Sequence, residues 1–88
     1  MDIESVGEHV EAIVLFGPRS MQPVRIRWKG GVYKIRRVVS SWDQTRGLDR
    51  TRHLVVETDK SNVLELVFDK MELSWRIDRV IDREEVDH

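Results

Sequence analysis

The fold of this chain is decided by residues 23–37, which read PVRIRWKGGVYKIRR. Apolar and charged residues alternate on both sides of Gly30-Gly31, and such alternation is typical of half-buried β-strands. Two glycines between alternating runs predict a tight hairpin, because the turns that join such strands need positive φ angles, which glycine adopts without strain. We therefore expect a β-hairpin with Gly30 and Gly31 as its two turn residues.

A two-residue turn also predicts the register and the two faces of this hairpin. The expected cross-strand pairs are Lys29–Val32, Trp28–Tyr33, Arg27–Lys34, Ile26–Ile35 and Arg25–Arg36. One face would be apolar and aromatic, and the other would be basic. The alternation loses phase at Arg36-Arg37, so we expect a β-bulge near Arg37.

Alternating stretches elsewhere predict further strands with turn residues between them. The expected strands are 9–16, 51–58, 63–69 and 72–81; residues 43–50 are expected to form a polar loop, and the charged tail from Asp82 to His88 is expected to fray. Leu73 and Trp75 should face inward, as should Trp28, and Trp28→Ala is expected to cost about 3–5 kcal/mol. The chain is therefore predicted to be one all-β domain over residues 1–88, an antiparallel meander of five or six strands that closes into a small barrel or half-barrel.

Length and composition limit the class of protein. A chain of 88 residues has room for one small core. It contains no cysteine, which excludes disulfides and thiolate metal sites. The longest apolar run, Ala12 to Phe16, is too short to cross a membrane, and the acidic N-terminus has no apolar signal core. We expect a cytoplasmic protein with no membrane partner.

The formal net charge of −1 conceals an uneven distribution of charge along the chain. Residues 1–18 carry four acids and no base, and residues 19–52 carry ten bases and two acids. Residues 53–88 carry ten acids and five bases. Such asymmetry hints at contact with nucleic acid, and the alternative is that the basic and acidic regions neutralise each other across the fold.

The basic face of the hairpin is the candidate binding surface. Like charges that face each other across a ladder destabilise it by roughly 0.2–1 kcal/mol per pair, so something should compensate them. A neighbouring strand that presents Glu57, Glu65, Glu72 or Asp78 would do so, as would an anionic ligand such as a nucleic-acid backbone. The surface would comprise Arg25, Arg27, Lys29, Lys34 and Arg36, extended by Arg46, Arg50 and Arg52, with Trp42 as a stacking platform.

Catalytic and metal-binding patterns are weak. The chain has no cysteine nucleophile and no Gly-x-Ser-x-Gly motif, and its three histidines are scattered. No His-x-x-x-His or calcium-loop spacing occurs. His53 is expected to be an ordinary half-exposed strand residue. We expect no catalytic residue, no metal and no cofactor, and an enzyme is only a remote alternative.

Three separated motifs carry a family resemblance. They are P-x-x-x-x-W-x-G-x-x-Y-x-I at residues 23–35, E-L-x-F-D at 65–69 and W-x-I-x-R-V-x-D at 75–82, with Trp42 after the first. From the first to the last they span residues 23–82, about two-thirds of the chain, and they resemble small bacterial all-β domains of unknown function, some of which are associated with DNA-polymerase-like repair proteins. The resemblance implies an all-β fold and no catalytic residue.

Three function classes make different structural predictions. The sequence favours a non-catalytic binding module whose partner is a protein or a second copy of the chain, and this predicts an unpaired strand edge or an apolar patch. The alternative is a nucleic-acid-binding accessory domain that uses the basic hairpin face. An enzyme predicts a concave pocket with converging polar groups.

Overall fold

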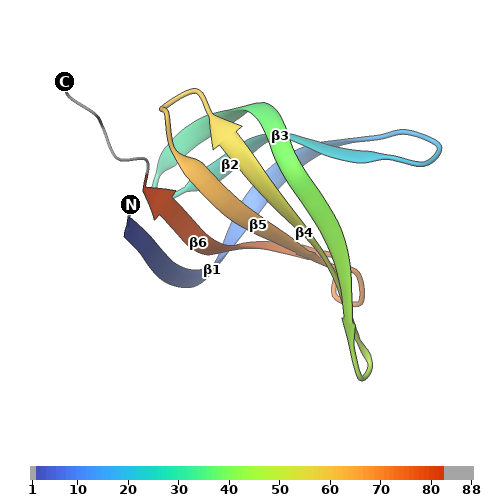
Figure 1. Ribbon diagram of the computed structural model, residues 1–88. Helices are drawn as coiled ribbons and strands as arrows, with labels where there is room; N and C mark the ends of the chain where they lie inside the picture. The colour runs from blue at the N-terminus through green and yellow to red at the C-terminus, as the bar shows by residue number, and fades with distance from the viewer. Residues whose placement is uncertain (1, 83–88) are drawn as a thin grey trace.

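The computed structural model describes residues 2–82, in which six antiparallel strands form one closed barrel (Figure 1). The strands are β1 (Asp2–Phe16), β2 (Met21–Trp28), β3 (Gly31–Arg46), β4 (Asp49–Thr58), β5 (Val63–Asp69) and β6 (Ser74–Asp82). Each strand pairs with the next, and β1 closes the ring by pairing with β6. The predicted all-β meander barrel is thus confirmed; residues 83–88 of the tail expected to fray lie outside the described residues.

The core consists of the inward-facing residues of the alternating strands. Its fully buried members are Ile26, Leu54, Val56, Leu64, Leu66, Trp75 and Ile77. Trp28 and Tyr33 are half-buried against this cluster, so the inward orientation expected for Trp28 and Trp75 is confirmed. Leu73 was expected to face inward as well, but it is exposed, because the β5–β6 turn extends as far as Leu73. The Asp69 carboxylate holds that turn by accepting hydrogen bonds from the amides of Met71 and Glu72.

The β2–β3 hairpin turns one residue earlier than expected. Its turn residues are Lys29 (φ 52°) and Gly30 (φ 76°), and the pairs are Arg25–Lys34, Ile26–Tyr33, Arg27–Val32 and Trp28–Gly31. The Trp28 indole thus lies opposite a residue without a side chain and packs diagonally on Tyr33, with ring centroids 5.9 Å apart. A register shift of two residues preserves the faces, so the apolar face still meets the core. Arg27 now opposes Val32, and only the Arg25–Lys34 pair of this ladder opposes like charges.

Two bulges bend β3. The β3–β4 register shifts between Ile35 and Arg37 and again between Val38 and Ser40, which confirms the bulge expected near Arg37. β3 pairs with β2 as far as Lys34 and with β4 from Ile35 onward. A bulge bends its strand, so one long strand can serve two neighbours of a small barrel.

The polar loop expected at residues 43–50 is instead the end of a long β3–β4 hairpin. Its strands stay paired out to Arg46–Asp49, and Gly47 (φ 62°) and Leu48 form the turn. The sequence is polar because both faces of this extension meet water, and cross-strand ion pairing stabilises it in place of a core. Asp43 Oδ1 accepts from Arg52 Nε at 2.9 Å and from Lys70 Nζ at 3.2 Å, and Oδ2 accepts from Arg52 at 3.1 Å.

Asp43 is expected to titrate near pH 2. Hydrogen bonds from Arg52 and then Lys70 lower its pKa from 3.8 to about 2. Since the folded-state pKa lies below the unfolded one, the stabilisation is complete above about pH 4 and is lost as the pH falls through 2. A carboxyl ¹³C NMR titration measures the midpoint, and Arg52→Gln should move it towards 3.8. A midpoint near 4 in the unmodified protein would contradict the pairing.

Candidate ligand-binding hollow

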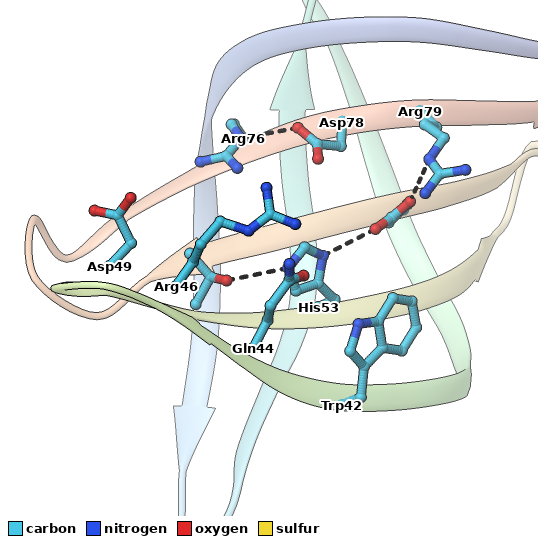
Figure 2. A pocket seen from close by; sticks show the side chains of 10 residues that line it. Trp42, Gln44, Arg46, Asp49, His53, Arg76, Asp78 and Arg79 are labelled. Atoms are coloured by element: carbon cyan, nitrogen blue, oxygen red, sulfur yellow. Dashed lines mark hydrogen bonds and ion pairs between the residues drawn. The ribbon is translucent and has the colours of Figure 1, made fainter.

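A hollow of about 410 Å³ lies on the outer face of the sheet and is lined by residues of β3, β4, β5 and β6 (Figure 2). The lining side chains are Trp42, Gln44, Arg46, Asp49, Thr51, His53, Glu65, Arg76, Asp78 and Arg79. Strand alternation explains the set, because Trp42, Gln44 and Arg46 point to one face while Asp43 between them points to the other. The outer face of a barrel usually meets water, so enclosed polar groups here are unusual.

His53 forms the floor of the hollow. It is only 7% exposed, with Nδ1 2.9 Å from Glu65 Oε2 and Nε2 3.0 Å from Thr51 Oγ1. In a neutral ring, Nδ1–H donates to the carboxylate and Nε2 accepts from the Thr51 hydroxyl. The Trp42 ring covers it in a stacked arrangement, with centroids 5.2 Å apart and planes 8° from parallel. The expectation of a half-exposed His53 is therefore wrong, because that expectation did not include the indole above it.

A β-bulge in β6 completes the wall. Glu65 pairs with Arg79 and Leu66 pairs with Ile77, so Asp78 is the extra residue. Without this bulge, alternation would turn Arg79 towards the core. With it, Arg79 Nε lies 2.7 Å from Glu65 Oε1, and Arg76 Nε lies 2.8 Å from Asp78 Oδ1. Glu65 is 3% exposed and is bound from both sides, by His53 and by Arg79.

His53, Glu65 and Asp78 are also grouped closely enough to be considered as metal ligands. One ligand atom from each lies within 4.8 Å of the others. Both carboxylates, however, are already held by guanidinium groups, Glu65 by Arg79 and Asp78 by Arg76. A divalent cation would have to displace these groups and remain beside their positive charge. The arrangement therefore favours a ligand other than a cation.

Trp42 and Arg46 are both exposed side chains of the hollow, as are Asp49 and Arg79. Trp42 is 42% exposed although it stacks on His53, and Arg46 is exposed. Within residues 2–82, Arg46 has no ion pair. Figure 2 shows these two side chains on opposite sides of His53. An aromatic ring and a free cation are thus presented together above a hydrogen-bonded floor.

The nine side chains expected to bind nucleic acid fall into two groups. Arg25, Arg27, Lys29 and Lys34 lie on the β2–β3 hairpin, and Arg36 lies in the first bulge of β3. Trp42, Arg46, Arg50 and Arg52 lie on the β3–β4 hairpin. Of all nine, Trp42 and Arg46 line the hollow, whereas Arg52 is held by Asp43.

Most of the acidic residues expected to compensate the basic hairpin lie away from it. Glu57 pairs with Arg37, while Glu65 and Asp78 pair with the arginines of the hollow. The neighbour that approaches the basic face is Glu11 of β1, whose carboxylate lies 3.8 Å from Arg27. The expectation is wrong for Glu65, Asp78 and Glu72, which lie on β5, on β6 and in the turn between them, because neither strand borders the hairpin; Glu57 lies on β4, which does border β3.

Sequence reasoning missed the His53–Glu65–Arg79 network. Alternation correctly placed Glu65 on the outer face but suggested that this face was solvated. A signal was present in Val55, Val63 and Val67, which are apolar residues in the outward phase of β4 and β5. Apolar residues in that phase indicate that the outer face is partly covered.

Comparison with family models, curated proteins and solved structures gives no match for this chain. The described part of the chain has no helix long and apolar enough to cross a membrane.

Proposed function

We propose that the protein is a non-catalytic binding module that holds a single strand of nucleic acid in the hollow on the outer face. The observation that carries this proposal is the presence of exposed Trp42 and unpaired Arg46 in one hollow. Aromatic side chains stack on bases regardless of their identity, and basic side chains bind the phosphates between them.

The floor supports this role by fixing the indole before a ligand arrives. Trp42 stacks on His53, and both nitrogens of that imidazole are hydrogen-bonded within the chain. A side chain already held in place loses less conformational entropy on binding, which improves affinity.

The polar lining suits exposed base edges. Gln44 offers an amide donor and acceptor, and Asp49 offers a carboxylate acceptor. Unpaired bases present their edges to such groups, whereas a duplex hides them. The volume lies within the range of roughly 300–1,000 Å³ typical of small-ligand sites.

The groups in the hollow favour binding over catalysis. Thr51, His53 and Glu65 follow the hydroxyl–imidazole–carboxylate order of a nucleophile with its base. The imidazole, however, is only 7% exposed and lies beneath the Trp42 ring, so it is not open to a substrate. The absence of cysteine suits the cytoplasmic location that we propose.

Fluorescence anisotropy with labelled single- and double-stranded DNA and RNA, at about 50 and 200 mM salt, tests the proposal. We expect single strands to bind more tightly than duplexes, and binding to weaken with salt. Trp42→Ala should weaken binding about 5- to 150-fold, because stacking contributes about 1–3 kcal/mol per base. Arg46→Gln should weaken binding and reduce the salt dependence, since one phosphate contact is lost.

The double variant Arg25→Gln/Arg27→Gln provides a matched control on the β2–β3 hairpin. It also removes arginine, but it should leave affinity close to that of the unmodified protein. If this variant loses binding while Trp42→Ala retains it, the basic hairpin is the binding surface and the hollow is not. Absence of binding at the lower salt concentration, or preference for duplex, would overturn the proposal.

A further inference from the structure

The β1–β2 hairpin ends in a two-stranded arm (Figure 1). The ladder between β1 and β6 ends at Val10, and from Glu11 to Phe16 the described residues of β1 pair with β2 alone. On the other side, β2 pairs with β3 only from Arg25 onward. Past these points, each strand of the arm has one edge without a ladder partner in the described part of the chain.

The two edges of the arm differ in their protection against further pairing. The β2 edge contains Pro23, which has no N–H, and a bulge at Val24 that interrupts the regular spacing. Proline and bulges are the devices by which edge strands avoid other chains. The β1 edge from Ala12 to Phe16 contains neither, and it carries no charge.

Large apolar side chains accompany the open β1 edge. Ile13 is 59% exposed, Leu15 is 60% exposed and Phe16 is 71% exposed. Ile13 and Leu15 share the outer face, while Ala12 and Val14, which alternate with them, pack against the core. An unprotected edge next to exposed apolar residues is suited to adding another strand.

We propose that β1 pairs antiparallel with β1 of a second copy, so that the two arms form one four-stranded sheet about a two-fold axis at Val14. Paired residues of antiparallel strands share a face, so the permitted registers pair outer residues with outer residues. With the axis at Val14, Ile13 faces Leu15 of the second copy, and Ala12 faces its Phe16. An axis at Ile13 would instead place Glu11 against Leu15, which would bury a charge against an apolar side chain.

The length of the free edge also fits a second copy. The open edge runs from Glu11 to Phe16, and in this register the last residue of the second β1 before its turn, Phe16, lies opposite Ala12. The turn that begins at Gly17 then directs the second chain away before it reaches Val10, where β6 already occupies the edge. The length of the added strand matches the length of the free edge because the same segment of β1 provides both.

Sedimentation velocity of the full chain over a range of concentrations, with a charge exchange at the facing positions, tests this inference. We expect the unmodified protein to dimerise, and Ile13→Lys and Leu15→Glu each to be monomeric. An equimolar mixture of the two variants should dimerise again, because the ammonium group introduced by Ile13→Lys then faces the carboxylate introduced by Leu15→Glu, while the unchanged Leu15 and Ile13 face each other at the second contact. Dimerisation of the mixture therefore tests whether positions 13 and 15 face each other, and not only whether β1 lies in the interface.

Val32→Lys is the matched control, because Val32 is also an exposed apolar residue on the outer face, at 47%. It should dimerise like the unmodified protein, and circular dichroism should show that all variants remain folded. An unmodified protein that is monomeric throughout would overturn self-association and leave the edge to a different chain. A dimer that persists in both variants, or variants that do not recover on mixing, would overturn the β1 pairing.

Discussion

Replacement of Trp75 by alanine should lower the free energy of unfolding by about 3–5 kcal/mol. Trp75 is buried among the core residues of β4, β5 and β6, and its ring lies 5.0 Å from that of Phe68. Removing it leaves a cavity that the rigid ring of strands cannot close completely. Small domains have a total stability of only about 5–15 kcal/mol, so the loss is a large fraction of it. Urea unfolding followed by circular dichroism measures the change.

Trp28→Ala is the matched comparison, with an expected loss of about 1–2 kcal/mol. The sequence alone suggested the larger cost for Trp28, because alternation placed it inward. In the structure it lies near the hairpin turn, half-buried, and its indole N–H donates to the exposed Glu8 at 2.8 Å. Part of the ring therefore remains in water. Equal losses for the two tryptophans would contradict this difference in burial.

The fold was predictable because strand periodicity is a local property. Alternation in residues 23–37 and 63–69 assigned the inner face, and phase loss near Arg37 indicated the bulge. The turn position was harder to predict, since Gly30-Gly31 fits a turn at either position. In the observed turn Trp28 pairs with Gly31, and its ring contacts that of Tyr33 diagonally, with centroids 5.9 Å apart. The two-glycine pattern contains no information about such contacts across the hairpin.

The candidate site was less predictable because it joins residues from distant positions. His53 and Glu65 meet through the β4–β5 ladder, and Trp42 reaches His53 through the β3–β4 ladder. Arg79 joins them only because of the bulge at Asp78. A bulge of one residue leaves little trace in a short alternating run, so the sequence pattern gave no reason to place Arg79 beside Glu65.

Glu65→Ala is expected to destabilise the protein by about 2–4 kcal/mol. The substitution leaves the His53 Nδ1–H buried without an acceptor and removes the partner of Arg79. Breaking a buried polar pair from one side costs more than the pair itself contributes, because the remaining group stays desolvated. Urea unfolding measures the loss. Arg37→Ala, which breaks the more exposed pair with Glu57, should cost below about 1 kcal/mol.

Replacement of both polar partners separates stability from binding. His53→Leu/Glu65→Leu should regain most of the stability lost in Glu65→Ala, since the buried imidazole and carboxylate are both removed, and the groups that lose them as partners, Thr51 and Arg79, are not fully buried. It should nevertheless bind single strands more weakly than the unmodified protein, because Trp42 loses its flat platform. His53→Phe/Glu65→Leu keeps an aromatic ring beneath Trp42 and should bind more tightly than the double leucine variant. This pattern would mean that the flat ring beneath Trp42 serves binding, and that a stable barrel can form without the polar network. A double variant as unstable as Glu65→Ala would show instead that the barrel itself needs the network.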